Sequence, residues 1–287
     1  MQFGIKISIL KIFKNVLTDK HNYVITKIPT ELLNEMHLEV GVLDTKEILQ
    51  NIHRRIDISG VRADVSLQEL ENIAKAAKHY QFICAFALPC FTPYLLRLLK
   101  DEPNVRVGAT IGFPSGAETT FLKMASAKEQ IAMGVDELDM VINIGAAKSG
   151  RFDIVEQDIR SVVEVADGRY PVKSILEIAY LTDDEIKRAS EVAVRAGVTY
   201  VKTGTGWAGK PTTVDTIKLI KATIGDAAKI KAAGGVRTLD TMLQMIDAGC
   251  DRFGIGLRSI MSIMKDVDAY LGRTDDFSLD GHANDTY

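Results

Sequence analysis

From about residue 50 onward, short apolar runs alternate with longer segments of helical periodicity, and this alternation constrains the fold more than any other feature of the chain. It is typical of repeated βα units around a parallel sheet. The predicted strands are residues 55–59, 82–88, 105–111, 137–144, 172–178, 200–203, 229–232 and 252–256. Eight units favour an α/β fold closed into a (β/α)₈ TIM barrel over an open sheet, whose glycine-rich dinucleotide fingerprint is not found in the sequence.

Residues that start and end helices support this division. Ser66 and Thr182 each stand three residues before a glutamate, which is the spacing of a capping box. Three helices are predicted to end at a glycine in a left-handed conformation, and these glycines are Gly134, Gly197 and Gly249. Five residues beyond each glycine, the chain reaches a position expected near the carboxyl end of a strand. These positions are Asp139, Lys202 and Gly254.

The barrel is predicted to span residues 51–272, between a mostly helical N-terminal extension (1–50) and a flexible acidic tail (273–287). In the extension, lysines interrupt the apolar residues too often for a secretory signal or a membrane span. We therefore expect a cytoplasmic protein whose extension packs on the barrel. A basic helix that touches an anionic membrane or a partner is the alternative.

Charge and cysteine content exclude several classes of protein. The chain has 35 Lys and Arg residues against 38 Asp and Glu residues, so it offers no general positive field to nucleic acid. Cys84, Cys90 and Cys250 stand in apolar stretches without metal-ligand spacing, and we predict buried thiols in a reducing compartment. The five histidines also lack metal-ligand spacing, so no metal is expected and metal catalysis is disfavoured.

Three lysines with apolar neighbours lie in successive predicted strands. Lys173, Lys202 and Lys231 follow one another at intervals of 29 residues. If their strands are neighbours in a barrel, the ammonium groups converge, and burial with mutual repulsion lowers the pKa of at least one. A neutral amine attacks a carbonyl carbon to form a Schiff base. A single strand lysine is more often a snorkelling edge residue, but three in register favour a reactive cluster.

Acidic residues begin the fourth predicted strand. Alternation places Asp139 on the face opposite Leu138 and Met140, so we expect a buried carboxylate that pairs with the inward lysines and takes part in proton transfer. A surface acid at a strand end is the alternative. Asp136 and Glu137 are predicted to be solvated loop residues.

Glycines after the seventh and eighth predicted strands indicate an anion site. Gly234, Gly235, Val236 and Arg237 follow the seventh strand and open a helix, so their backbone N–H groups can approach an anion. A Gly-Gly pair alone usually marks a tight turn, but barrels favour phosphate binding at this end of strands seven and eight. After the eighth strand we expect further contacts from Gly254, Gly256 and Arg258.

Four motifs in this order resemble the deoxyribose-phosphate aldolase family over roughly residues 53–265. They are residues 112–116 (GFPSG), 136–145 (DELDMVINIG), 201–206 (VKTGTG) and 231–238 (KAAGGVRT). The resemblance implies a class I aldolase that needs no cofactor and reversibly splits 2-deoxy-D-ribose 5-phosphate into acetaldehyde and D-glyceraldehyde 3-phosphate.

The resemblance also implies roles for individual residues. Lys202 corresponds to the Schiff-base lysine, Lys231 to the neighbouring cation that lowers its pKa, and Asp139 to the acid/base partner. Substrate contacts are expected from Lys173, Asp57, Ser59 and Thr205, and a further phosphate contact from Gly206. We also expect a homo-oligomer, with a dimer as the first hypothesis, and Tyr287 resembles a terminal tyrosine that assists proton transfer in some members.

The chain departs from the family pattern on the substrate side. Gly204 stands where members usually have serine, and Gly256 and Leu257 replace two serines that contact the phosphate. Arg258 or Arg237 could supply charged donors instead. These departures keep two alternatives open. One is an aldolase for a related or unphosphorylated carbonyl compound, and the other is a catalytically weak relative that acts as a binding protein.

Overall fold

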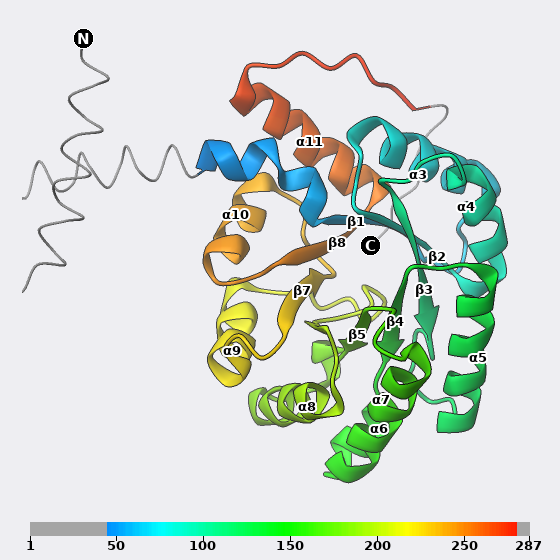
Figure 1. Cartoon of the computed structure of the whole chain (residues 1–287). Helices are drawn as coiled ribbons and strands as arrows, with labels where there is room; N and C mark the ends of the chain where they lie inside the picture. Colours follow the sequence, from blue (N-terminus) through cyan, green and yellow to red (C-terminus); the bar gives the residue numbers. More distant parts are fainter. Residues whose placement is uncertain (1–44, 280–287) are drawn as a thin grey trace, which may run out of the picture. The chain divides into compact units, whose positions relative to one another are not determined.

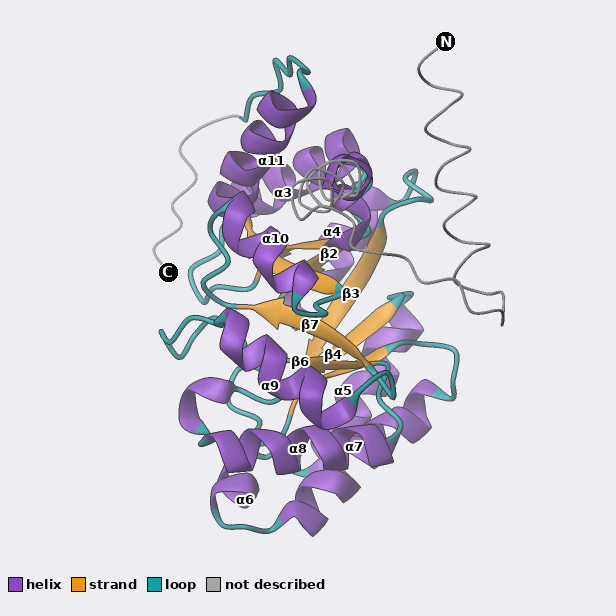
Figure 2. Ribbon diagram, turned by 90° about the vertical axis from the view of Figure 1, so that its left-hand side faces the viewer, coloured by secondary structure: helices purple, strands orange, loops and turns teal. Residues whose placement is uncertain are grey.

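The computed structural model describes residues 45–279, so the predicted extension up to residue 44 and the end of the tail from residue 280 lie outside the described residues. Eight parallel strands close into one barrel in sequence order, and β1 pairs with both β2 and β8. The helices form a layer around the strands (Figures 1 and 2). The TIM-barrel prediction is therefore confirmed.

The strands are short, and each is followed by at least one helix. The strands are β1 (Ile56–Gly60), β2 (Cys84–Ala87), β3 (Arg106–Ile111), β4 (Glu137–Val141), β5 (Val172–Ile175), β6 (Tyr200–Lys202), β7 (Lys229–Ala233) and β8 (Arg252–Gly256). The α-helices are α3 (Leu67–Tyr80), α4 (Thr92–Leu99), α5 (Thr120–Met133), α6 (Ile144–Lys148), α7 (Phe152–Ala166), α8 (Asp183–Ala196), α9 (Val214–Ile224), α10 (Leu239–Asp247) and α11 (Leu257–Leu271). Short 3₁₀ helices are η1 (Ile52–Arg55), η2 (Pro89–Phe91) and η3 (Ile178–Tyr180). Residues 45–50 are also helical.

The predicted helix boundaries are confirmed. Ser66 Oγ accepts the backbone N–H of Glu69 at the start of α3, and Thr182 and Glu185 form a reciprocal capping box at the start of α8. The three glycines predicted to end helices all have a left-handed backbone. Their φ angles are 102° at Gly134, 93° at Gly197 and 98° at Gly249.

Two strands end earlier than predicted because polar residues turn the chain into a helix. β4 ends at Val141, since the side chain of Asn143 accepts the N–H of Ala146 and starts α6. β5 ends at Ile175, and Glu177 adopts a left-handed backbone before η3. Both turns lie at the carboxyl end of the barrel, where βα loops form the active sites of this fold.

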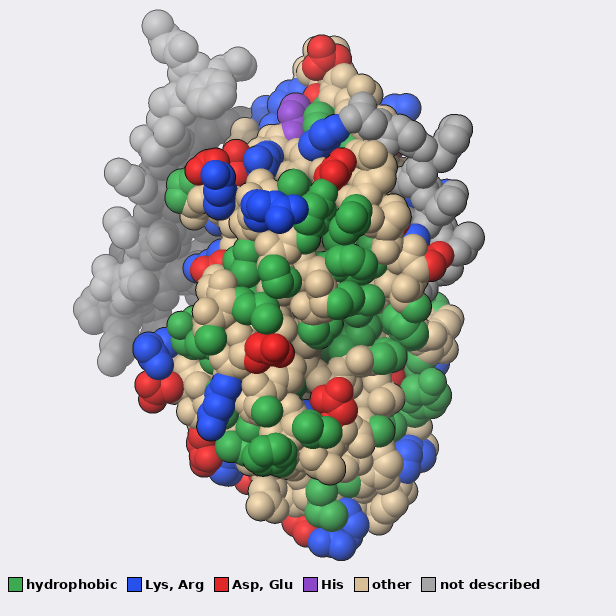
Figure 3. Space-filling view, turned by 90° about the vertical axis from the view of Figure 1, so that its right-hand side faces the viewer, with side chains coloured by type: hydrophobic (Ala, Val, Ile, Leu, Met, Phe, Trp, Pro, Cys, Tyr) green, Lys and Arg blue, Asp and Glu red, His purple; other side chains and the backbone are tan. Residues whose placement is uncertain are grey.

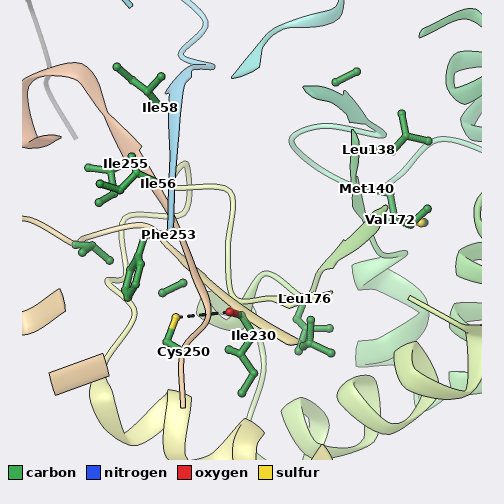
Figure 4. Packing of buried hydrophobic residues seen from close by; sticks show 14 of the residues in the cluster. Ile56, Ile58, Leu138, Met140, Val172, Leu176, Ile230, Cys250, Phe253 and Ile255 are labelled. Carbon is green, nitrogen blue, oxygen red and sulfur yellow. Dashed lines mark hydrogen bonds between the residues drawn. The ribbon is translucent and has the colours of Figure 1, made fainter. Parts of the chain in front are cut away.

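Most apolar residues of the strands point outward, toward the helices. Figure 4 shows Ile56, Ile58, Leu138 and Met140 in this layer, and all four are buried. Because side chains alternate along a strand, the residues between them point into the barrel. This packing therefore places the charged residues of the same strands inside the ring.

The three cysteines do not share one environment. Cys84 and Cys250 are buried as predicted, and the Cys250 thiol contacts the backbone carbonyl of Ile230 (Figure 4). The prediction of a buried Cys90 is wrong, because the apolar run that contains it leaves β2 after Ala87 and enters η2 at the surface.

Helix α5 has an unusual distribution of side chains. It buries Lys123 and Gln130 against the barrel, whereas Phe121 and Leu122 are 76% and 51% exposed. Lys123 Nζ is held by Asp158 at 2.5 Å and by a backbone carbonyl of β4. Figure 3 views the side on which α4 and α5 lie, and apolar side chains gather on this face. The expected homo-oligomer stays a prediction.

The described part of the tail, residues 273–279, contacts the end of α3. Asp275 pairs with the His79 ring at 3.0 Å, and Phe277 stacks on the same ring. The flexibility of the tail as a whole stays a prediction. Within residues 45–279, every helix is too short or too polar to cross a membrane.

Candidate active site

Three lysines from adjacent strands meet on one buried carboxylate. Asp139 Oδ1 accepts a hydrogen bond from Lys173 at 2.8 Å, and Oδ2 accepts from Lys202 at 2.8 Å and from Lys231 at 2.6 Å. The strand register sets this meeting, because Asp139 pairs with Lys173 across β4 and β5, and Lys202 pairs with Lys231 across β6 and β7. The predicted convergence of the lysines is thus a property of the closed barrel.

A second layer of charges lies nearer the amino ends of the strands. Asp57 contacts Lys231 and Arg252, both at 2.6 Å. Glu137 contacts Lys173 at 2.6 Å and Arg252 at 2.9 Å. Lys173 and Lys231 therefore connect the two layers, and each of the three carboxylates in these layers has at least two cationic partners.

The prediction that Glu137 is solvated is wrong, because it is the first residue of β4 and is fully buried. The same period of two that turns Asp139 inward also turns Glu137 inward, so the sequence contained this signal. Asp136 is exposed, as predicted. Arg252 was not predicted as part of the site, although the alternation of β8 places it on the inner face.

The charge balance of this cluster singles out one lysine. Three carboxylates face four buried cations, so the buried part of the cluster is neutral when one of these cations loses its proton. The carboxylates are Asp57, Glu137 and Asp139, and the cations are Lys173, Lys202, Lys231 and Arg252. Lys173 contacts all three carboxylates, Lys231 and Arg252 contact two each, and Lys202 contacts Asp139. The ammonium form of Lys202 is therefore stabilised least.

The pKa values of Lys173 and Lys202 differ in the same sense. Burial lowers the pKa of Lys202 to about 8; Asp139 opposes this shift, and the charges of Lys231 and Lys173 add to it. Burial acts on Lys173 as well, but its three carboxylates raise the pKa of that ammonium well above its usual range. The three lysines overcome the effect of burial on Asp139 and hold its pKa well below the usual range. At neutral pH, an appreciable fraction of the protein thus carries an uncharged amine at Lys202.

A cavity of about 250 Å³ opens above Lys202 and Lys231 at the carboxyl end of the barrel. It is lined by most of the residues predicted to bind substrate or phosphate. These are Asp57, Ser59, Thr205, Gly206, Gly234, Gly235, Val236, Arg237, Gly254, Gly256 and Arg258. Phe86, Thr110, Phe113 and Arg62 complete much of the remaining wall. This volume lies slightly below the usual range for drug-sized ligands of about 300–1,000 Å³, and it suits a smaller substrate.

Lys173 lies outside this lining. Its side chain is fully buried beneath Asp139, where three carboxylates surround it. This position disagrees with the prediction that Lys173 contacts substrate. The spacing of the three lysines placed them in register but could not reveal which of them line the cavity; Asp139 also lies outside its lining.

The end of the cavity remote from Lys202 is built for close approach of an anion. Gly234 and Gly235 have φ angles of 88° and 80°, and a Cβ at Gly235 would lie 2.8 Å from the Cα of Pro211. Helix α11 starts beside these glycines, with Gly256 as its N-cap residue. The free N–H groups and positive dipole end of a helix attract anions. Arg237 and Arg258 add two guanidinium groups to the same lining.

Glu177 was not identified from the sequence. It is buried, and its Oε2 accepts the backbone N–H of Thr205 at 3.1 Å as well as a very short hydrogen bond from the Thr205 hydroxyl. Burial raises the pKa of Glu177, although these two hydrogen bonds act in the opposite direction. A Cβ at Gly204 would lie 3.0 Å from Glu177 Oε1, so this carboxyl occupies the space where a family serine would extend.

Trp207 joins loops on different sides of the cavity mouth. Its backbone N–H donates to Thr205 Oγ1, and its indole Nε1–H donates to the carbonyl oxygen of Val61, both at 2.9 Å. Its ring also packs edge to face on Phe113, with centroids 5.9 Å apart. Val61 and Phe113 both line the cavity, so Trp207 supports the wall from outside.

One group of potential metal ligands exists among the described residues. The ligand atoms of Asp57, Cys84 and Glu137 lie within 4.8 Å of one another. Both carboxylates already pair with Arg252 and a lysine, and burial raises the pKa of the Cys84 thiol well above its usual value. A protonated thiol beside three cations is an unsuitable donor set for a divalent ion.

Comparisons with known proteins agree with this architecture. Residues 45–259 match the family described as DeoC/LacD family aldolase. A protein named deoxyribose-phosphate aldolase from Sinorhizobium medicae (strain WSM419) is 43% identical over 217 residues, which cover 76% of this chain and 87% of the relative. A protein of the same name from Staphylococcus carnosus (strain TM300) is 41% identical over 215 residues, which cover 74% and 97%.

A solved structure shares the fold and part of the sequence. It is an aldolase designated QR15, with 31% sequence identity, a TM-score of 0.70 and coverage of 77% of this chain and 96% of the other. The match of the family over most of the barrel and the identity to the two curated relatives lead to the same assignment. The chain belongs to the DeoC/LacD family of aldolases.

Proposed function

We propose that this chain is a class I aldolase that reversibly cleaves 2-deoxy-D-ribose 5-phosphate into acetaldehyde and D-glyceraldehyde 3-phosphate. The observation that carries the proposal is Lys202, whose amine lines the cavity and whose pKa burial lowers to about 8. The substrate is suggested by the names of relatives that are 41–43% identical to this chain. A cytoplasmic location and a homodimer remain predictions.

The reaction starts when the neutral amine of Lys202 attacks the C1 aldehyde carbon of the open-chain sugar. The carbinolamine that forms loses water and becomes a protonated imine on Lys202. Lys231 and Asp139 lie beside this nitrogen, and the hydrogen bond between them is 2.6 Å long. They exchange the protons that the addition and the loss of water require.

Cleavage then breaks the bond between C2 and C3. A base takes the proton of the C3 hydroxyl, the C2–C3 electron pair moves toward the iminium nitrogen, and D-glyceraldehyde 3-phosphate leaves. The enamine that remains on Lys202 is protonated at C2, and water hydrolyses the resulting imine to acetaldehyde and free Lys202. We assign the proton transfers at C2 and C3 to Lys231 and Asp139, with cavity water as the carrier.

The phosphate of the substrate occupies the remote end of the cavity. The backbone of Gly234 and Gly235, the N-terminus of α11 and the guanidinium groups of Arg237 and Arg258 support this placement. Charge-assisted hydrogen bonds from arginine would replace the two hydroxyl contacts that Gly256 and Leu257 cannot make.

Borohydride reduction in the presence of acetaldehyde tests the covalent step. The wild-type protein should gain the mass of a reduced acetaldehyde adduct on Lys202, and Lys202→Leu should not be labelled. Lys210→Leu, which removes an exposed lysine from the same loop, is the matched control and should be labelled like the wild type. Unchanged labelling of Lys202→Leu would remove the assignment.

A second candidate is an aldolase for an unphosphorylated carbonyl compound. Gly256 and Leu257 favour it, because they offer no side-chain hydroxyl to a phosphate. The comparison of kcat/KM for deoxyribose and its 5-phosphate separates the two, and a strong preference for the phosphate would exclude this candidate. A weak relative that acts as a binding protein would show little turnover of either sugar and would retain a partner in a pull-down.

A further inference from the structure

Arg252 is a buried arginine at the amino end of β8, outside the cavity lining. Its Nε donates to Asp57 Oδ1 at 2.6 Å, and its Nη2 donates to Glu137 Oε2 at 2.9 Å. A guanidinium group fits two carboxylates at once because its donors are held in a rigid plane. Arg252 thus neutralises two carboxylates that it shares with lysines of the cluster.

The contacts of Arg252 cross the barrel. β8 pairs with β1, which carries Asp57, but β4, which carries Glu137, stands four strands away in the closed order. Glu137 therefore approaches Arg252 through the interior of the ring. The single side chain of Arg252 consequently links opposite walls of the barrel below the cavity.

The link from Arg252 to the cavity runs through shared carboxylates. Lys231 contacts Asp57 and also Asp139 Oδ2, which is the oxygen that Lys202 contacts. If Arg252 lost its charge, Lys231 would be needed to balance Asp57. Lys231 would then stabilise the charge of Asp139 less strongly. The nearest group that could replace it is Lys202 in its protonated form.

We propose that Arg252 is a positioning residue that keeps Lys202 in its reactive form, because it neutralises Asp57 and Glu137 and so leaves Lys231 and Lys173 to neutralise Asp139. The inference rests on the proposed function of Lys202 as the nucleophile. It assigns an electrostatic role to a residue that lies a full layer away from the substrate.

Several charged and titratable groups face Lys202 and Arg252 at the two ends of this pathway. The described groups that act on Lys202 are Asp139, Lys231, Lys173 and Glu177. Around Arg252 lie Asp57, Glu137, Cys84, Tyr200, Arg54 and Arg106. Arg106 contacts Glu137 from the outside at 2.7 Å and is 47% exposed, so solvent screens its charge.

The test changes one charge of each sign and follows the titration of Lys202. Acetylation of Lys202 by acetic anhydride is measured against pH by mass spectrometry, with exposed Lys210 as the internal reference. Arg252→Met should move the midpoint of Lys202 upward by about one pH unit, because Lys231 is then needed by Asp57 and Asp139 stabilises the ammonium form of Lys202 more strongly. Glu137→Gln should move it downward, and the double variant should return it close to the wild-type value.

Arg252→Lys is the conservative variant, and it should leave the midpoint near the wild-type value because it keeps the charge. Arg252→Met should also reduce borohydride trapping of acetaldehyde at neutral pH by about fivefold to tenfold, with recovery at alkaline pH, since a shift of one pKa unit changes the neutral fraction about tenfold. If Arg252 had only a structural role, Arg252→Met and Glu137→Gln would both be less stable than the wild type. The midpoint of Lys202 acetylation would then not shift in opposite directions in the two variants.

Midpoints that do not move, or that move in the same direction in the two single variants, would overturn the inference. If Arg252→Met does not fold, the downward shift in Glu137→Gln and the unchanged midpoint in Arg252→Lys still decide it. Failure of the proposed function gives a different result. In that case wild-type Lys202 is acetylated with the expected pH dependence but forms no acetaldehyde adduct.

Discussion

Lys202 and Lys231 donate hydrogen bonds to the same oxygen of Asp139, at 2.8 and 2.6 Å. Two ammonium groups that share one acceptor repel each other, which favours the neutral form of the less stabilised one. Both lysines line the cavity, but Lys231 contacts a second carboxylate, Asp57, whereas Lys202 contacts Asp139 alone among the described carboxylates. The shared oxygen therefore leaves Lys202 as the amine available for reaction.

Lys231→Met should lower kcat by at least about 100-fold, because it removes both the repulsion on Lys202 and a group that transfers protons. The pH at which acetaldehyde is trapped on Lys202 should rise at the same time. Lys229→Met, an exposed change in the same strand, is the matched control. Steady-state kinetics with a pH series of borohydride trapping would check both effects, and a pH profile equal to that of the wild type would contradict the electrostatic part.

Lys202→Met should stabilise the protein at neutral pH. The pKa of Lys202 is lowered to about 8 in the folded protein, so the unfolded chain binds this proton more tightly. Stability attributable to this group therefore rises as pH increases from about 8 to about 10.5, and below that window the charged form costs about 3 kcal/mol. Urea unfolding across this range should show a smaller rise for Lys202→Met than for the wild type. If the free energy of unfolding changed equally with pH in both proteins, the lowered pKa of Lys202 would be excluded.

Arg258→Ala should weaken binding of a phosphorylated substrate. A charge-assisted hydrogen bond contributes about 1.5–3 kcal/mol, so KM for deoxyribose 5-phosphate should rise about 10-fold or more. Deoxyribose itself should be cleaved at the wild-type rate, because it has no anion at the N-terminus of α11. If kcat/KM fell equally for both sugars, Arg258 would not act through the phosphate group.

Gly235→Ala should impair the anion end of the cavity through the backbone. The residue has a φ of 80°, and the added Cβ would press on the Cα of Pro211. Gly209→Ala is a matched control, since its φ is 74° and a Cβ there meets open space. We expect inorganic phosphate to bind at least about fivefold more weakly to Gly235→Ala than to Gly209→Ala, as measured by titration calorimetry. Equal affinities would argue against phosphate binding at this loop.

Trp207→Phe keeps an aromatic ring but removes the hydrogen bond to the carbonyl of Val61. The loss of one such bond costs about 1 kcal/mol, so KM for the phosphorylated substrate should rise about fivefold while kcat stays within about twofold. Trp207 is the only tryptophan of the chain, so its fluorescence reports directly on this loop in the wild type. If phosphate does not change the fluorescence of the wild type and KM is unchanged in Trp207→Phe, the hydrogen bond from Trp207 to Val61 has no role in substrate binding.

The fold could be predicted because hydrophobic periodicity is local. Alternation in β4 placed Asp139 inward, and glycines such as Gly197 marked the ends of helices. The same rule should have placed Glu137 inward, but its position at the first residue of the strand resembled a loop. The ends of strands were harder to predict. β4 ends where the side chain of Asn143 caps helix α6, and the pattern of apolar residues does not reveal such a cap.

The candidate site was predicted only as far as strand order determines it. Neighbouring strands bring Lys202 and Lys231 together, and equal spacing in the sequence is enough to suggest this. Contacts across the ring, such as Arg252 with Glu137, join residues 115 positions apart on strands that are not neighbours. Such contacts depend on barrel closure and side-chain reach, for which a single sequence carries no periodic signal.

The pairing of β1 with β8 completes the ring, and with it the contact between Asp57 and Arg252. In an unfolded chain, which lacks both the burial and the neighbouring charges, the amine of Lys202 has the ordinary pKa of a solvated lysine. The reactive amine is therefore a property of the closed ring and not of the lysine alone.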